Sequence, residues 1–117
     1  MIDIKLSLES QKQNLVDAFR KNGIPFEIHG NAVVLRYTMH GPEYQKMLDR
    51  INSTQRELLQ AKQIEKGKIN YVRGRDLDGQ LQPISDRELL VYHFGSEEEF
   101  RLLRESMYPP PLFRRER

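Results

Sequence analysis

The sequence contains no cysteine, which excludes disulfide bonds, thiol nucleophiles and cysteine-ligated metal sites. This absence also fits a reducing cytoplasm. No apolar run approaches the ~18 residues that a membrane span needs. The N-terminal residues alternate in polarity, so they lack the basic-then-apolar order of a signal peptide. We therefore expect a soluble cytoplasmic protein without membrane contact.

An excess of charge of one sign is also missing. Lysine and arginine number 19 against 17 aspartate and glutamate, a net charge of +2 among 117 residues. A strongly basic chain would suggest a nucleic-acid partner, whereas this balance leaves room only for a local basic patch. The length suits one domain with one ordinary core, for which neither a metal nor a disulfide is needed.

The signatures of catalysis and of ligand binding are absent too. The three histidines, His29, His40 and His93, have no metal-ligand spacing. There is no G-x-S-x-G nucleophile motif, and no glycine pattern that cradles phosphate. We expect no catalytic residue, no cofactor and no metal. An enzyme whose site is invisible in the sequence is kept as a further alternative.

The first part of the chain predicts a strand, a helix and a hairpin. Apolar residues alternate with polar ones over residues 2–8, which is typical of a strand with one buried face. A helix is expected from Ser10 to the terminating pair at 22–23. The two-residue turn Gly30-Asn31 then predicts a hairpin. Its register places one set of side chains toward the core: Phe26, Ile28, Val33, Leu35 and Tyr37.

A long helix over 42–66 and a short strand from Ile69 to Val72 follow the hairpin. The resulting order, β-α-β-β-α-β, is that of an α+β, ferredoxin-like fold, in which two helices cover one face of an antiparallel sheet. We expect this core to occupy residues 1–75. Fold alone does not indicate function.

Residues 76–107 are expected to pack on this core as part of the same domain. They predict a turn, a short hairpin arm limited to a sheet edge by Pro83, and two short helices. The first helix is expected over 85–94, where Ser85 and Glu88 form a capping-box pattern, and the second over 96–107. Residues 108–117 form a proline-rich basic tail, either docked on its own domain or folding on a partner.

Two segments offer more apolar or extended surface than the core requires, and they motivate the first functional hypothesis. The helix over 42–66 is longer than a small sheet needs, so its second half either packs on its own core or overhangs to contact a partner or a second copy of the chain. The hypothesis is a non-enzymatic adaptor, inhibitor or regulatory subunit that docks on a larger protein or complex. Its predicted contact residues are Leu58, Leu59, Tyr108, Leu112 and Phe113.

The alternative is binding of RNA or single-stranded nucleic acid by the segment 66–75. This segment carries four basic side chains, one aromatic and no acid. Basic groups neutralise phosphates, and a tyrosine on a sheet face can stack on a base. The residues concerned are Lys66, Lys68, Tyr71, Arg73 and Arg75. A solvated edge strand that positive charge protects from aggregation would show the same pattern, and so would a strand that binds an acidic protein partner.

Overall fold

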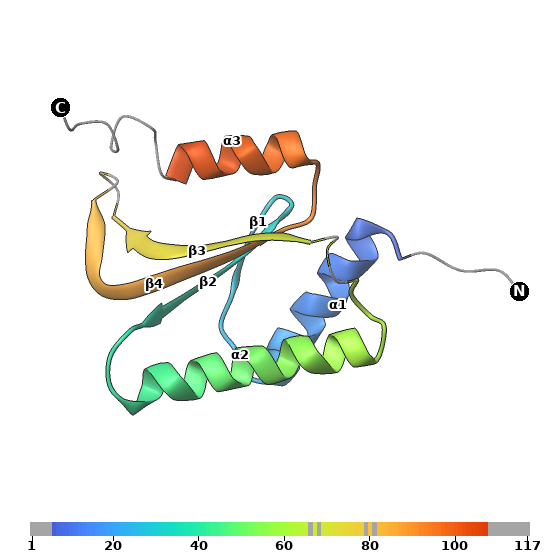
Figure 1. The fold of residues 1–117 in the computed structure, drawn as a ribbon, viewed down its shortest axis with the longest axis horizontal. Coiled ribbons are helices and arrows are strands. Elements are labelled where there is room, and N and C mark those ends of the chain that lie inside the picture. The colour runs from blue at the N-terminus through green and yellow to red at the C-terminus, as the bar shows by residue number, and fades with distance from the viewer. Residues whose placement is uncertain (1–5, 66, 68, 79, 81, 108–117) are drawn as a thin grey trace, which may run out of the picture.

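The computed structural model describes residues 6–65, 67, 69–78, 80 and 82–107 (Figure 1). The helices are α1 (Leu8–Lys21), α2 (Pro42–Gln60) and α3 (Glu97–Met107), and the strands are β1 (Glu27–His29), β2 (Ala32–Thr38), β3 (Asn70–Leu77) and β4 (Pro83–His93). The strands form one antiparallel sheet in the order β1-β2-β4-β3. The α+β class is therefore confirmed.

The ferredoxin-like order is not confirmed, because α1 precedes the first described strand. Most of the strand expected over residues 2–8 lies outside the described residues. Its last residue, Leu8, begins α1 instead. Ser7 caps this helix, since its side chain accepts a hydrogen bond of 3.0 Å from the backbone N–H of Ser10. The helix ends as predicted, with Gly23 at a φ of +69° and the N–H of Ile24 bonded to the carbonyl of Phe19.

The hairpin closes at Gly30 and Asn31, as its turn residues predict. Gly30 has a φ of +61°, and Ile28 lies opposite Val33 in the expected register. Val33 and Leu35 are buried as predicted, but Ile28 is 48% exposed, which corrects its expected place in the core. The reason is its position on β1, an edge strand of three residues.

Residues 85–94 lie almost entirely in β4, so the prediction of a short helix there is wrong. β4 is a central strand between β2 and β3, not an edge arm. Pro83 is tolerated because it is the first residue of the strand. Four consecutive apolar side chains are buried, on alternating faces of the sheet: Leu89, Leu90, Val91 and Tyr92. A strand covered on both faces shows such a continuous apolar run.

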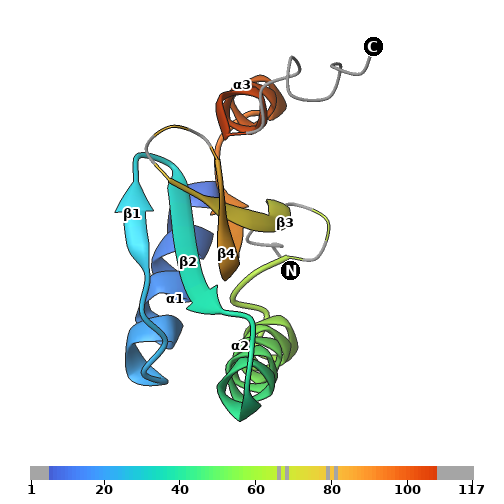
Figure 2. The same ribbon diagram turned by 90° about the vertical axis from the view of Figure 1, so that its left-hand side faces the viewer.

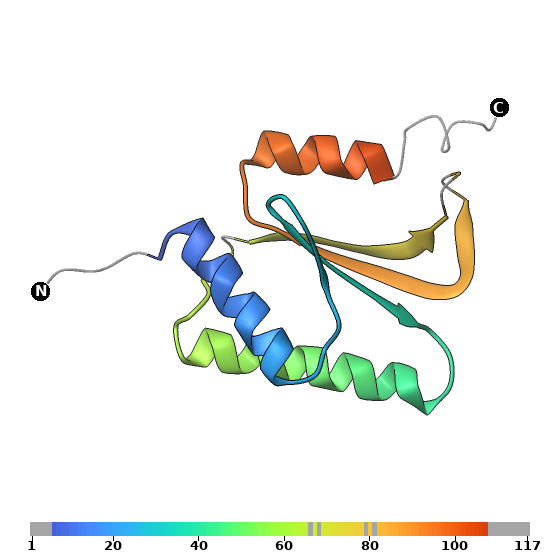
Figure 3. The same cartoon turned by 180° about the vertical axis from the view of Figure 1, so that it is seen from behind.

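Helices cover both faces of the sheet, with α1 and α2 on one face and α3 on the other (Figure 2). Seen from behind, α1 crosses α2 at an angle (Figure 3). Two hydrogen bonds join this helix layer: Asn22 donates to the hydroxyl of Thr54 over 3.0 Å, and Asn14 donates to the carbonyl of Gln63 over 2.8 Å. The main core lies between this layer and the sheet.

The helix expected over 42–66 ends at Gln60. Lys62 has a φ of +59°, which turns the chain away from the helix axis. The second half of α2 contributes to the core of its own domain, because Leu58 is 3% exposed and Ile64, beyond the helix, is 8% exposed. Leu59, the next residue of the helix after Leu58, stays 38% exposed.

The helix expected from residue 96 is confirmed as α3. Ser96 and Glu99 form a reciprocal capping box, in which each backbone N–H donates to the other's side chain, over 3.0 and 3.1 Å. Leu103 packs against the smaller apolar cluster on this face of the sheet. The ring of Phe100 lies 5.7 Å from that of His93. Strand and helix are thereby held together at one end of the sheet.

Candidate nucleic-acid interface on strand β3

Strand β3 presents three predicted side chains on one side: Tyr71, Arg73 and Arg75. They lie opposite Tyr92, Leu90 and Glu88 of β4, and Leu90 and Tyr92 belong to the core beneath α1 and α2. Side chains two residues apart on a strand share a face, so the three project toward the α1–α2 side. On this side α2 reaches β4, where Tyr44 contacts Glu88 and Gln55 contacts Tyr92. All three side chains are exposed, Tyr71 by 63%.

The ring of Tyr71 lies next to that of Tyr92, its partner in the sheet register. Their centroids are 6.3 Å apart and their planes differ by 30°. Tyr92 is buried, burial raises the pKa of its hydroxyl, and Gln55 of α2 donates a hydrogen bond to it. Tyr71 therefore has a buried aromatic neighbour, while most of its own side chain is exposed.

Arg73 lies beside a carboxylate that α2 holds in place. Its Nε is 3.9 Å from Oε1 of Glu88, and the same oxygen accepts a hydrogen bond of 3.2 Å from the hydroxyl of Tyr44. The Arg73 side chain is 44% exposed, whereas that of Glu88 is only 11% exposed. Nearly half of the Arg73 side chain thus remains exposed, with its charge partly offset by a nearly buried acid.

Tyr37 completes this cluster from β2. Its hydroxyl is buried and, within the described part of the chain, has no hydrogen-bond partner. Burial raises the pKa of Tyr37, and the carboxylate of Glu88 raises it further. Its ring lies 6.1 Å from that of Tyr44. Tyr37 and Tyr44 therefore stay neutral, and both lie beside the carboxylate of Glu88.

A second group of charges lies on the α3 side of the sheet, and it is neutralised internally. Asp76 is 2% exposed and pairs with both Arg36 and Arg87, the latter over 3.3 Å. Arg36 also donates to Glu27 over 3.0 Å. The side chain of His29 lies 2.9 Å from Glu27, and this contact lowers the pKa of that carboxyl. With acids matched to bases, this group suits strand pairing better than phosphate binding.

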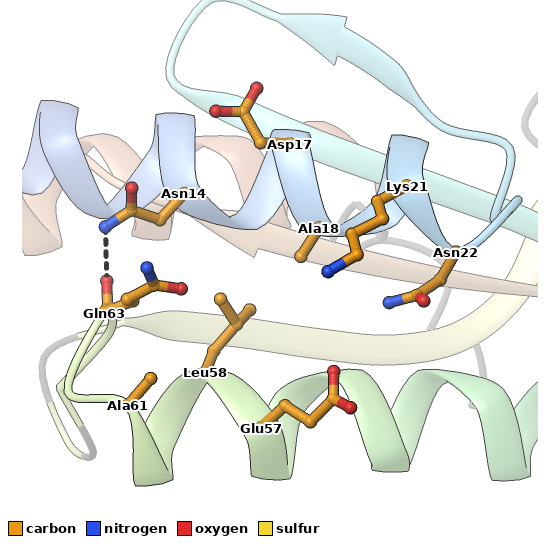
Figure 4. A pocket seen from close by; sticks show the side chains of 9 residues that line it. All are labelled: Asn14, Asp17, Ala18, Lys21, Asn22, Glu57, Leu58, Ala61 and Gln63. Atoms are coloured by element: carbon orange, nitrogen blue, oxygen red, sulfur yellow. Dashed lines mark hydrogen bonds between the residues drawn. The ribbon is translucent and has the colours of Figure 1, made fainter.

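A cleft of about 370 Å³ lies between α1 and α2 (Figure 4). Lys21 projects into it from α1, and Glu57 points toward it from α2. Leu58 lines its floor. The walls carry two carboxylates against one cation, so the cleft does not attract phosphate. The cleft lies on the side of α2 that faces α1, which is the side away from β3.

The predicted docking residues differ in their exposure to solvent. Leu58 is buried in the core, which corrects its prediction as a surface contact. Leu59 is 38% exposed. Tyr108, Leu112 and Phe113 lie outside the described residues. The same is true of Lys66 and Lys68 of the basic segment.

Three residues around the basic strand were not predicted from the sequence: Glu88, Tyr44 and Gln55. The pattern at Glu88 predicts the start of a helix, but the residue lies in β4, and the other two belong to a helix distant in sequence. The available signal was the continuous apolar run from Leu89 to Tyr92, which is typical of a strand buried on both faces.

Within the described ranges, no group of histidine and acidic side chains could hold a metal ion. No helix in this part of the chain is long and apolar enough to cross a membrane. Comparison with known proteins gave no match: no family model matches the sequence, and neither does a curated protein or a solved structure.

Proposed function

We propose that the protein binds single-stranded nucleic acid on the α1–α2 side of β3. One observation carries the proposal: an aromatic ring that is 63% exposed shares one side of an edge strand with two exposed arginines. Tyr71 offers a stacking surface for a base, and Arg73 and Arg75 offer charge to the backbone. Open stacking platforms beside basic side chains are the usual means of binding single strands.

The energies expected for such a site are sufficient for measurable binding. Stacking of one base on an aromatic side chain contributes about 1–3 kcal/mol. Each phosphate neutralised in a single strand steepens the salt dependence of binding by about 0.7 in log–log slope. The contribution of this site is small at physiological salt and grows as salt falls. We therefore expect a weak, salt-sensitive and sequence-tolerant interaction.

Fluorescence anisotropy with a labelled single strand of mixed sequence tests the proposal. We expect binding at about 50 mM salt, weakening steeply as salt rises. Replacing both arginines (Arg73→Gln with Arg75→Gln) is expected to reduce the salt slope by about 1.4. Tyr71→Ala is expected to weaken binding about 5- to 150-fold, whereas Tyr71→Phe retains the ring and most of the affinity.

Arg50→Gln supplies a matched control. Arg50 is exposed on α2, one turn before Thr54, whose hydroxyl meets Asn22 beside α1. It therefore lies on the flank away from β3, and its loss should leave the salt slope nearly unchanged. Absence of binding by RNA and by DNA at about 50 mM salt would contradict the proposal, because phosphate contacts are strongest there.

Docking on another protein is the second candidate, favoured by two exposed side chains with apolar surface on this side of the sheet. Leu59 is one helical turn beyond Gln55, which bonds Tyr92, so it lies on the flank of α2 that faces β3. Leu59 and Tyr71 are 38% and 63% exposed. Tyrosine and arginine are also the residues that dominate protein interfaces. Retention of a protein partner after nuclease treatment, and its loss with Leu59→Glu, would favour this candidate.

A further inference from the structure

The Tyr71 ring is 63% exposed, and the ring of Tyr92 lies beside it at a centroid distance of 6.3 Å. It can therefore stack on a base of a single strand. A base on this ring keeps, at most, one stacked neighbour in its own strand. Binding thus requires that one stacking step of the nucleic acid be open.

The arginines require that the strand continue along β3 beyond this base. Side chains two residues apart on a strand are separated by about 6.8 Å, so Arg73 and Arg75 leave β3 at distinct points in a straight row with Tyr71. A strand whose bases are weakly stacked adapts its backbone to this row more easily than one held in a continuous stack. A duplex is unsuitable as well, since its base faces are covered by their neighbours.

From this geometry we infer that the ligand is a weakly stacked, pyrimidine-rich single strand. It places one base on Tyr71 and separate phosphates on Arg73 and Arg75. Preferences of this kind follow from the cost of opening stacks and from backbone flexibility, not from hydrogen bonds to base edges. The inference rests on the proposed function and adds the class of strand that the site accepts.

The favourable stacking of a larger base opposes this preference, and the two effects can be separated. Adenine covers more of a tyrosine ring than uracil does, but an adenine strand must lose a stronger stack to reach it. A uridine strand with one central adenosine offers the large base without the stacked neighbours. It should bind at least as tightly as uridine alone.

The experiment compares oligo(U), oligo(A), oligo(U) with one central adenosine, oligo(dT), oligo(dA) and a duplex, all of about twelve nucleotides, at about 50 mM salt. We expect oligo(U) and oligo(dT) to bind about fivefold more tightly than oligo(A) and oligo(dA), and the duplex more than about tenfold more weakly. Whether the ribose or the deoxyribose strand binds better identifies the natural source. Tyr71→Ala should remove the preference for uridine, and Tyr71→Phe should keep it.

The single variants Arg73→Gln and Arg75→Gln should each lower the salt slope by about 0.7, and the double variant by about 1.4. Equal binding of oligo(U) and oligo(A), or of single strand and duplex, would overturn the inference and leave the proposed function standing. A double variant no different in slope from either single variant would also overturn it, because both arginines would then hold one phosphate. Absence of binding by every strand would overturn both.

Discussion

Arg36 on β2 forms an ion pair with Asp76 on β3 across the strand that separates them, β4. Leu89 of β4 lies directly opposite Arg36 in the sheet register, and it is 4% exposed. Arg87 binds the other carboxylate oxygen of Asp76 over 3.3 Å. The acid therefore connects three strands on the α3 side of the sheet. We therefore expect the free energy of unfolding to depend on the carboxylate of Asp76.

Asp76→Asn should lower the free energy of unfolding by about 2–3 kcal/mol in urea denaturation. Removing one partner of a buried ion pair costs about 3–5 kcal/mol. The cost is smaller here because the Arg36 and Arg87 side chains are 34% and 43% exposed and can turn toward water. Asp17→Asn is the control, since the Asp17–Arg20 pair is exposed on both sides. Equal effects of the two substitutions would mean that the Asp76 cluster does not hold the strands.

Glu88→Gln should strengthen nucleic-acid binding. The carboxylate lies 3.9 Å from Arg73 and competes with phosphate for the guanidinium. A glutamine keeps an oxygen for the hydroxyl of Tyr44 but carries no charge. We expect an affinity gain of about two- to fivefold at low salt, corresponding to about 0.5–1 kcal/mol. Glu57→Gln, on the flank that faces α1, should change little. Weaker binding by Glu88→Gln would show that the carboxylate is needed to position Arg73.

His93 should make the stability depend on pH in the mildly acidic range. Burial lowers its pKa below the ordinary value of 6.5, although the carboxylate of Glu99 acts in the opposite direction. Nδ1 accepts a hydrogen bond of 3.3 Å from the backbone N–H of Gly95, which the neutral ring alone can do. The unfolded chain therefore takes up the proton at higher pH than the folded chain. The resulting stabilisation is present above about pH 6.5 and is lost as the pH falls through the lower, folded pKa.

Urea denaturation of the wild type and of His93→Gln between about pH 7.5 and 5 isolates this effect, since both proteins share every other titrating group. The stability of the wild type should fall more on acidification. The lowered pKa of His93 comes from burial at the junction of β4 and α3, where its ring lies 5.7 Å from that of Phe100. Parallel stability curves for the two proteins would contradict the prediction.

Leu58 and Leu59 should behave as opposites although they are neighbours in sequence. Leu58 is 3% exposed in the core, so Leu58→Ala should lower the free energy of unfolding by about 2–5 kcal/mol. Leu59 is 38% exposed, and Leu59→Ala should change stability by less than about 0.5–1 kcal/mol. Thermal denaturation of the two variants checks this pair. Similar losses would mean that α2 is rotated relative to the arrangement described.

Local chemistry was sufficient to predict several elements. Gly30 and Asn31 select a tight hairpin turn, and Ser96 with Glu99 forms the capping box of α3. The start of β4 shows where local chemistry misleads. Ser85 and Glu88 have the same capping spacing, yet the chain there is extended and Asp86 has a φ of +60°. Burial on both faces of the sheet decides this segment, and that depends on α1, α2 and α3 together.

The candidate site likewise has one part that the sequence predicts and another part that it does not. Alternation along one strand was enough to place Tyr71, Arg73 and Arg75 on one side, once residues 70–77 are a strand. The groups that support and moderate them come from elsewhere in the chain. Tyr92 and Glu88 belong to β4, which was expected to be helical. No spacing in the sequence reports such contacts.

The central position of β4 has a consequence for synthesis on the ribosome. β2 and β3 make no ladder with each other, and each pairs with β4. β4 follows both in the chain, so a nascent chain that stops before Pro83 holds a single hairpin and an unpaired third strand. The sheet therefore closes late and in one step. Until then the unpaired edges of β2 and β3 are open to other strands, which is the stage at which a chaperone would have most effect on its yield.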